Sequence, residues 1–174
     1  MDTVKDYVEL VKAPWGRMFY DLLFSQLNIP HTPKLKILDF GSGLGVTADY
    51  FAEWHEVTAV EPDEEMINNA CNQNKYEQIH GSIEKLTVFA DRSVDLIFCH
   101  NVLEYIENKE PIVAELLRIL KPGGVYDPFG KTTTETLCSL SGRNNLQCVH
   151  LRQIPQARYS HPHNKIAHRR SKEP

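Results

Sequence analysis

The sequence predicts an α/β fold in which helices cover both faces of a doubly wound parallel sheet. Before residue 130, the chain alternates short apolar runs with amphipathic helical patterns, as βαβ units do. The runs are apolar at nearly every position, which is typical of strands buried on both faces. Right-handed crossovers between such strands produce the doubly wound arrangement. The 174 residues suit one domain and would be cramped for two.

Two helices are expected ahead of the first strand. Apolar side chains recur at helical spacing in residues 2–12: Val4, Tyr7, Val8 and Val11. Residues 17–27 place another group on one side of a second helix: Met18, Phe19, Leu22, Leu23 and Leu27. Pro14 ends the first pattern, and Pro30 and Pro33 mark the loop that follows the second.

Further strands and helices are expected to alternate after that loop. The strands are Lys36–Phe40, Val57–Val60, a weak Tyr76–His80, and Val94–Cys99. The first two helices that alternate with these strands cover residues 46–54 and 64–74. The last helix has Asn108 as its N-cap and Pro111 in its first turn, and Lys121-Pro-Gly-Gly124 ends it.

Charge divides the chain near residue 130. Residues 1–130 hold 11 Lys and Arg against 21 Asp and Glu, a net charge of −10, whereas residues 131–174 hold 8 against 2, a net charge of +6. The total of −4 argues against a uniformly basic nucleic-acid binder. Residues 131–174 are also poor in apolar side chains. We therefore expect a folded domain over residues 1–130 and a basic, disordered or aberrant tail over residues 131–174.

Composition disfavours several classes of protein. No apolar run approaches the roughly 18 residues of a membrane span. The start of the chain is rich in charged side chains and lacks the apolar core of a signal peptide. The 4 cysteines include no CxxC pair, which argues against a zinc site or a disulfide framework. We therefore expect a cytoplasmic protein that uses neither a membrane nor a metal.

A glycine-rich turn, Gly41-Ser-Gly-Leu-Gly45, joins the first strand to its helix. Glycines let a ligand approach the backbone closely, and a helix N-terminus favours a negatively charged ligand group. A tight turn without a ligand could carry the same glycines. The spacing is GxGxG, and Val46 stands where the dinucleotide fingerprint requires Gly or Ala, which disfavours an NAD(P) oxidoreductase.

Two acidic residues accompany this turn. Asp39 precedes it, and Glu61 ends the second strand, 20 residues after Gly41. A carboxylate in the position of Glu61 can accept hydrogen bonds from both ribose hydroxyls of a nucleoside. The alternative for Glu61 is a solvated loop carboxylate.

Blocks of sequence in a fixed order resemble the class I S-adenosylmethionine-dependent methyltransferases. The blocks are ILDFGSGLG, VEPD, HGSIEKL, SVDLIFCHNVLEYI and LLRILKPGG. The resemblance covers residues 17 to about 125, and HNVLEYIENKEPIVAELLRILKPGG looks most like the tRNA 5-carboxymethoxyuridine methyltransferase group. The resemblance implies a Rossmann-like sheet, S-adenosyl-L-methionine as the cofactor, and a small molecule or a tRNA as the methyl acceptor.

The resemblance also implies the residues of a cofactor site: Arg17, Gly41, Ser42, Gly43, Glu61, Ile83, Glu84 and His100. The residues of the glycine turn would line the methionine and the ribose, and Glu61 would hold the ribose. Ile83 and Glu84 would flank the adenine. His100 would border the transferable methyl group, and the planar fork of Arg17 would pair with the methionine carboxylate.

Some of these residues also have an interpretation without function. Arg17 fits an exposed position of an amphipathic helix, Ile83 a core position, and His100 a structural histidine. Ser82 stands where many relatives carry an aspartate for the adenine amino group, and its neutral hydroxyl would bind that group more weakly. A hydroxyl or amine acceptor would require a general base, for which His100 is the best-placed residue, whereas a carboxylate acceptor requires none. The catalytic residues stay unassigned.

The end of the chain departs from the family pattern. The family continues past Val125 with a buried fifth strand and two more, whereas here Pro128 and Gly130 interrupt the pattern. The resemblance therefore implies a sheet truncated after its fifth-strand position, with self-association through the uncovered edge.

Residues 131–174 have three interpretations. We favour a tail without function. The others are a cationic RNA-binding arm around His168–Lys172 and the product of a reading-frame shift near residue 125. The alternative to an active methyltransferase is a non-catalytic module or an inactive enzyme that binds S-adenosylmethionine.

Overall fold

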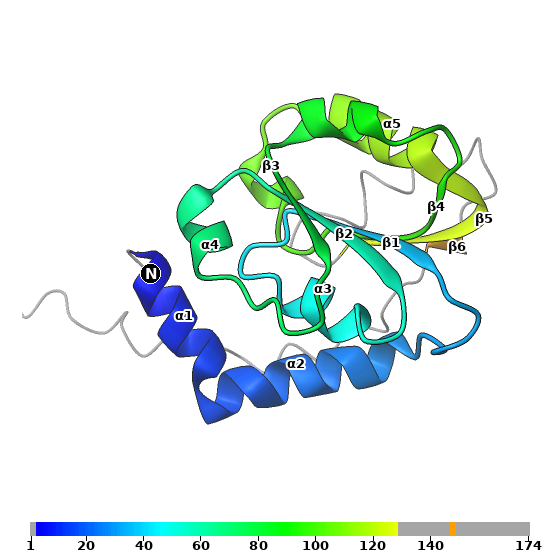
Figure 1. Cartoon of the computed structure of the whole chain (residues 1–174). Coiled ribbons are helices and arrows are strands. Elements are labelled where there is room, and N and C mark those ends of the chain that lie inside the picture. The colour runs from blue at the N-terminus through cyan, green and yellow to red at the C-terminus, as the bar shows by residue number, and fades with distance from the viewer. Residues whose placement is uncertain (1–2, 129–146, 149–174) are drawn as a thin grey trace, which may run out of the picture.

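Six parallel strands form the sheet at the centre of the molecule (Figure 1). The computed structural model describes residues 3–128 and 147–148. The strands are β1 (Lys36–Phe40), β2 (Glu56–Glu61), β3 (Glu77–His80), β4 (Val94–Phe98), β5 (Leu120–Asp127) and β6 (Gln147–Cys148). Their order across the sheet is β3-β2-β1-β4-β5-β6. This arrangement confirms the predicted doubly wound parallel sheet.

The strand order reverses at β1, which pairs with β2 on one side and with β4 on the other. Asp39, near the end of β1, lies opposite Ala59 of β2 and Phe98 of β4. The connections therefore leave the carboxyl ends of β1 and β4 in opposite directions. Ligands of open α/β sheets bind at such a topological switch point.

Helices cover both faces of the sheet. They are α1 (Val4–Lys12), α2 (Pro14–Leu27), α3 (Val46–Phe51), α4 (Glu64–Asn68) and α5 (Glu110–Ile119), with short 3-10 helices η1 (Ile83–Val88) and η2 (Leu103–Tyr105). Figure 1 shows α5 on one face and α2 and α3 on the other.

Each face of the sheet has its own apolar core. On one face, Leu38 belongs to a buried cluster with Val113 and Leu116 of α5. Its neighbour Ile37 belongs instead to a cluster on the opposite face with Leu23 of α2. Successive strand residues point to opposite faces, so an apolar strand such as β1 supplies both cores.

The inward face of α2 differs from the predicted face. Leu23 and Phe24 are buried, with 2% and 8% of their surface exposed. Other members of the predicted stripe are exposed at 58%, 39% and 52%: Met18, Phe19 and Leu22. The helix also begins at Pro14 rather than at residue 17, because proline is compatible with a first helical turn.

Other element boundaries shift from the predicted ones. Helix α3 ends at Phe51 and α4 at Asn68, both earlier than predicted. The Asn69 side chain donates to the Glu65 carbonyl at 2.8 Å, which satisfies an acceptor at the end of α4 and competes with its continuation. The N-cap of α5 is Lys109 rather than Asn108.

The fifth strand is present and ends just before the predicted interruption at Pro128. Tyr126 and Asp127 are buried at its end, and Val125 pairs with Gln147 of β6. The short strand β6 was not predicted from the sequence. Residues 129–146 and 149–174 lie outside the described residues, so the expectations about the tail stay predictions.

Candidate functional site

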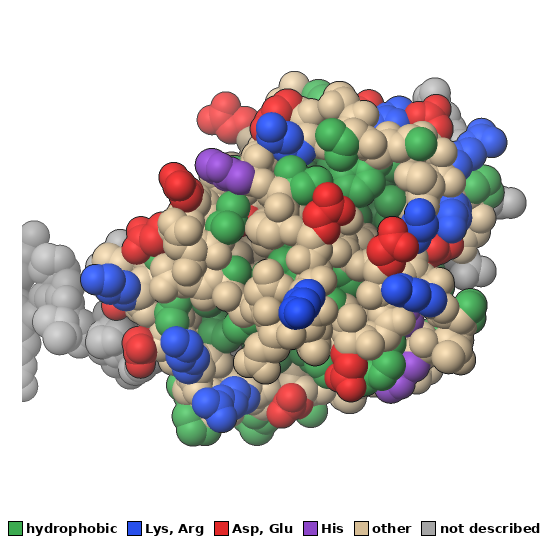
Figure 2. Space-filling model, viewed as in Figure 1, with side chains coloured by type: hydrophobic (Ala, Val, Ile, Leu, Met, Phe, Trp, Pro, Cys, Tyr) green, Lys and Arg blue, Asp and Glu red, His purple; other side chains and the backbone are tan. Residues whose placement is uncertain are grey.

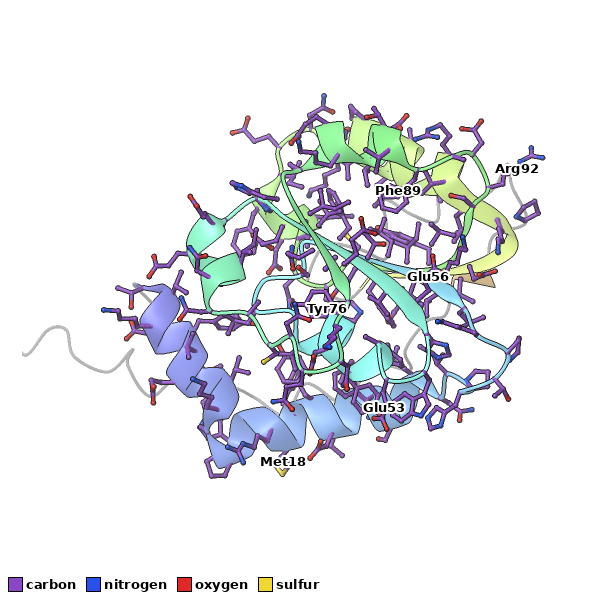
Figure 3. All side chains as sticks on the ribbon, viewed as in Figure 1. Met18, Glu53, Glu56, Tyr76, Phe89 and Arg92 are labelled. Carbon is purple, nitrogen blue, oxygen red and sulfur yellow. The ribbon has the colours of Figure 1, made fainter. Side chains whose placement is uncertain are left out.

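The glycine turn after β1 holds its three glycines in left-handed backbone conformations. Gly43 has a φ of +55°, and a Cβ added there would meet no atom within 4 Å, so the turn borders open space at this position. Gly41 and Gly45 are tightly enclosed, because an added Cβ would collide with Val102 and with the Tyr76 hydroxyl respectively (Tyr76 is labelled in Figure 3). Gly43 is therefore the position at which a ligand can approach the backbone.

Glu61 ties this turn to the end of β2. Its Oε2 atom accepts a hydrogen bond from the Gly43 backbone N–H at 2.7 Å, and its Oε1 atom accepts one from the Asp63 N–H at 2.9 Å. The residue is 7% exposed, so it is a buried carboxylate rather than a solvated one. A carboxylate has about four acceptor positions, which gives Glu61 capacity to accept ligand hydroxyl groups as well.

Asp39 is a buried carboxyl group at the carboxyl end of β1. It is 2% exposed, and its Oδ2 atom has no hydrogen-bond partner among the described residues. Burial raises the pKa of Asp39 to about 6, an effect that His100 and a backbone hydrogen bond from Ala48 oppose and that Glu61 reinforces. An unsatisfied buried acceptor fits a site for a positively charged ligand group.

His100 and Asp127 form a hydrogen-bonded pair at the adjoining strand ends. His100 follows β4, Asp127 ends β5, and His100 Nε2 lies 3.0 Å from Asp127 Oδ2. Their side chains are 12% and 2% exposed. The Cys99 N–H donates to the Asp127 carbonyl at 3.1 Å, so backbone pairing continues up to this point.

A row of ionisable side chains thus follows the strand order at the carboxyl edge of the sheet. Glu61 ends β2, Asp39 lies in β1, His100 follows β4, and Asp127 ends β5. The row is mainly acidic. This favours a positively charged ligand group beside the row. Helix α3, with 6 residues, is too short to contribute a large dipole for a negatively charged one.

The predicted adenine-flanking residues, Ile83 and Glu84, begin η1, which follows the turn after β3. The Gly81 N–H donates to the Glu61 carbonyl at 3.0 Å, which brings this turn to the end of β2. Ile83 is partly buried against the core on the α5 face. Glu84 is exposed and accepts a hydrogen bond from the Ser82 N–H at 2.9 Å, and this bond lowers the pKa of its carboxyl group. Glu84 therefore stabilises the start of η1.

Arg17 lies on α2, outside the row of strand ends. Its Nε donates to the Lys12 carbonyl at 3.1 Å, and the side chain is exposed, so it links α2 to the last turn of α1. Helix α1 reaches the site more directly, because Val8 and Val11 pack against Leu44 of the glycine turn. The pairing of Arg17 with a methionine carboxylate stays a prediction.

Asp127 belongs to this row of side chains but was not predicted from the sequence. It was included in the segment that interrupts the fifth strand. The available signal was its position, since an acidic residue also ends β2 at Glu61.

A cavity of about 310 Å³ lies along β5 and the end of α2, and Asp127 belongs to its lining together with Leu27, Leu96 and Val125.

The described residues show neither a metal-binding cluster nor a membrane-spanning helix. No group of three or more His, Cys, Asp or Glu side chains there could hold a metal ion. Among the described helices, none is both long enough and apolar enough to cross a membrane.

Residues 38–126 match a family model described as a methyltransferase domain. This match covers half of the chain. It includes the whole of β2, β3 and β4 and most of β1 and β5. The chain belongs to the methyltransferase domain family.

Relatives in this family act on different acceptors. A thiol S-methyltransferase of Homo sapiens is 31% identical over 113 residues, which are 60% of this chain and 46% of that protein. The tRNA 5-carboxymethoxyuridine methyltransferase of Escherichia coli K12 is 32% identical over 100 residues, which are 53% of this chain and 38% of that protein. The chain thus spans less than half the length of either relative, and the tRNA group is not singled out.

Solved structures share the fold. A protein from Pyrococcus horikoshii OT3 superposes with a TM-score of 0.57 at 26% identity, covering 66% of this chain and 57% of that chain. A SAM-dependent methyltransferase from Aquifex aeolicus superposes with a TM-score of 0.53 at 21% identity, covering 67% of each chain. The likeness to the Aquifex aeolicus protein, at 21% identity, supports the fold alone.

Proposed function

We propose that the chain binds S-adenosyl-L-methionine at the carboxyl ends of β1, β2 and β4 and that it is a methyltransferase acting on a small molecule. The observation that carries this proposal is the row of Glu61, Asp39 and His100 beside the open space at Gly43. When bound, the cofactor supplies an electrophilic methyl group on a positively charged sulfonium.

The residues present fit this cofactor. Glu61 has the acceptor capacity for ribose hydroxyls, and its carbonyl contacts the Gly81 N–H just before η1, whose start would flank the adenine. Asp39 and the buried hydroxyl of Ser42, which has no hydrogen-bond partner among the described residues, suit the polar methionine end. An acidic site also attracts a cationic ligand, since opposite charges in a partly buried site interact more strongly than in water. Arg17 remains the candidate partner for the methionine carboxylate.

Charge favours a small molecule over tRNA as the acceptor. Residues 1–130 carry a net charge of −10, and nucleic-acid binding depends on neutralising phosphates. On the face that Figure 2 shows, Lys and Arg side chains are interspersed with Asp and Glu rather than gathered into one patch. The thiol-methylating relative indicates one class of small acceptor.

We expect the protein to act in the cytoplasm.

A tRNA acceptor is the second candidate. It is favoured by the Escherichia coli relative and by the net charge of +6 on residues 131–174. Transfer of labelled methyl to tRNA that carries wobble carboxymethoxyuridine, with no transfer to small molecules, would select this candidate. Cofactor binding without transfer to any acceptor would indicate a non-catalytic module.

Calorimetric titration of the full chain tests the cofactor proposal. S-adenosylmethionine, its demethylated product S-adenosylhomocysteine, and NAD are titrated in parallel. We expect the first two to bind and NAD not to bind, because Val46 stands where the dinucleotide fingerprint requires Gly or Ala. Binding of NAD without any response to S-adenosylmethionine would overturn the proposal.

A further inference from the structure

The cavity of about 310 Å³ along β5 extends from one edge of the sheet to the other. Its lining includes Gly123 near the amino end of the strand and Asp127 at the carboxyl end. These residues are four strand steps apart, a length of about 13 Å at about 3.3 Å for each step. The opposite wall comes from the end of α2 and the segment before β1: Leu27, Ile29 and Leu35.

The walls of this cavity are apolar and incompletely covered. Some of its lining side chains pack against the apolar cluster on the α2 face and are still only partly buried: Leu27, Ile29, Leu35 and Val125. By contrast, Leu23 belongs to the same cluster without lining the cavity, and it is 2% exposed. An apolar ligand in the cavity would remove the remaining surface of these side chains from water, which is favourable.

The charged side chains of the lining already have partners. Lys121 Nζ lies 2.7 Å from Asp95 Oδ1, and the Lys36 N–H donates to Asp95 Oδ2 at 2.9 Å. Asp127 Oδ2 lies 3.0 Å from His100 Nε2. A ligand charge inside the cavity would therefore lack a counter-charge, and its burial would be costly. The ligand that fits is uncharged along the length of the cavity.

The volume and the position of the cavity set the size and direction of this ligand. A volume of about 310 Å³ holds about ten groups of the size of a water molecule, at about 30 Å³ each, and a methylene group is of similar size. The Asp127 end of the cavity meets the row of side chains at the carboxyl edge. A molecule in the cavity therefore has one end beside the proposed cofactor site.

We propose that this cavity holds the apolar body of the methyl acceptor, a chain of about eight to ten carbon atoms, with its polar end at the carboxyl edge beside Asp127. This inference rests on the proposed methyltransferase function and adds the class of acceptor, an elongated amphiphilic molecule. The length of the cavity, rather than a charged contact, then selects among acceptors.

The test titrates the full chain with straight-chain 1-alkanols from butanol to dodecanol, which are uncharged probes of the cavity and require no methyl transfer. NMR signals of labelled Leu, Ile and Val methyl groups report both the affinity and the position of binding. An acceptor must bind together with the cofactor, so each titration is repeated with saturating S-adenosylhomocysteine. Binding of S-adenosylmethionine is measured separately by calorimetry.

We expect affinity to rise about fourfold for each added methylene group, which corresponds to about 0.8 kcal/mol, and to stop rising near about ten carbon atoms. The methyl signals of Leu27, Ile29 and Val125 should shift, and those of Leu23 should not. Nuclear Overhauser contacts should join the hydroxyl-bearing carbon of the alkanol to the ring of His100. Saturating S-adenosylhomocysteine should leave the affinity unchanged or increase it.

Two substitutions should change the cavity in opposite directions. Val125→Phe should fill it and lower the affinity for 1-decanol by about tenfold or more. Val88→Phe is the matched control, because Val88 is 66% exposed on η1. Leu27→Ala should enlarge the cavity, so that affinity continues to rise for about two or three more carbon atoms. Melting temperature and binding of S-adenosylmethionine are measured for each variant, and loss of folding in one variant would not produce both results.

Several results would overturn the inference alone, with S-adenosylmethionine still bound by the wild-type chain. One is alkanol binding that leaves the methyl signals of the cavity unshifted or that S-adenosylhomocysteine abolishes. Another is a length limit that Leu27→Ala leaves unchanged. Absence of binding by any alkanol would show that another part of the chain or a second copy fills the cavity. Failure of the wild-type chain to bind S-adenosylmethionine, beside length-dependent binding of alkanols, would instead overturn the proposed function and with it the assignment of the ligand as a methyl acceptor.

Discussion

Glu61 accepts a hydrogen bond from the backbone N–H of Gly43 at 2.7 Å, which joins the turns that follow β1 and β2. The same carboxylate accepts from the Asp63 N–H at 2.9 Å. Because one buried side chain holds both turns, the shape of the glycine turn depends on the residue proposed to bind the ribose. Ligand binding and local structure are therefore coupled at this position.

Replacing Glu61 with Gln should weaken the binding of S-adenosylmethionine by about 1–3 kcal/mol, the usual scale for losing charge-assisted hydrogen bonds. The measurement is calorimetric titration of the full chain. Glu56→Gln is the matched control, because Glu56 begins the same strand at its opposite end and its side chain is 60% exposed (Figure 3). Equal affinities for the two variants would contradict the assigned role of Glu61.

Gly43→Ala should lower both stability and cofactor affinity. A φ of +55° is strained for alanine, at a cost of about 1–2 kcal/mol, and the new methyl group would enter the space open to the ligand. Gly123→Ala is a close control, since Gly123 has a φ of +78° and likewise has no atom within 4 Å of an added Cβ. Urea unfolding should show similar losses for both variants, and titration should show weaker binding for Gly43→Ala alone. Weaker binding by both would assign the effect to general destabilisation.

The sequence predicted which elements carry the candidate site where these depend on local patterns. The GxGxG turn and the acidic residue at the end of the next strand lie in short segments whose spacing is fixed by one βαβ unit, so Gly43 and Glu61 could both be expected at the same edge of the sheet. The hydrogen bond between them was not predicted. The contact between His100 and Asp127 joins two units across 27 residues. Because Pro128 also interrupted the strand pattern, periodicity did not place Asp127 at a strand end.

The buried face of α2 could not be predicted for a different reason. Its apolar side chains form two neighbouring stripes, one with Met18 and Leu22 and the other with Leu23 and Leu27, and the predicted side combined both. Their exposed fractions of 52% and 2% are set by how α2 docks on the sheet, which is a tertiary property. Periodicity identifies a helix and its apolar positions but does not choose between two such stripes.

This assignment gives a direct comparison between adjacent leucines. Leu23→Ala should lower the free energy of unfolding by about 2–5 kcal/mol, because it removes buried methyl groups and leaves a cavity. Leu22→Ala should change it by less than about 0.5 kcal/mol, as is usual for exposed positions. Urea unfolding monitored by circular dichroism measures both. Comparable losses would show that the outer stripe is also covered in the folded protein.

Asp39 should make stability depend on pH. Burial raises its pKa from the ordinary value of 3.8 to about 6. The folded state therefore binds the proton more tightly than the unfolded state, so this carboxyl group lowers the free energy of unfolding as pH rises from about 4 to about 6. A shift of this size corresponds to about 3 kcal/mol at most, at about 1.4 kcal/mol for each pKa unit.

Asp39→Asn removes this dependence, so relative to wild type it should be about 1–3 kcal/mol more stable at neutral pH than at pH about 4. The measurement is urea unfolding of the protein without cofactor across this pH range. Asp21→Asn, at an exposed position of α2, serves as the control and should follow wild type. Parallel stability profiles for wild type and Asp39→Asn would show that the Asp39 pKa is not raised in the folded protein.

The outer edge of β5 should mediate self-association. Among the described residues, β6 pairs with β5 only at Val125 and Tyr126, whereas β5 extends from Leu120 to Asp127. An edge with unpaired backbone groups is a template for pairing with another chain. Sedimentation velocity should therefore show reversible dimers whose fraction rises with protein concentration, and amide exchange within Leu120–Gly124 should slow as dimers form. A monomer at every concentration, with unchanged exchange in this segment, would show that the edge is already covered.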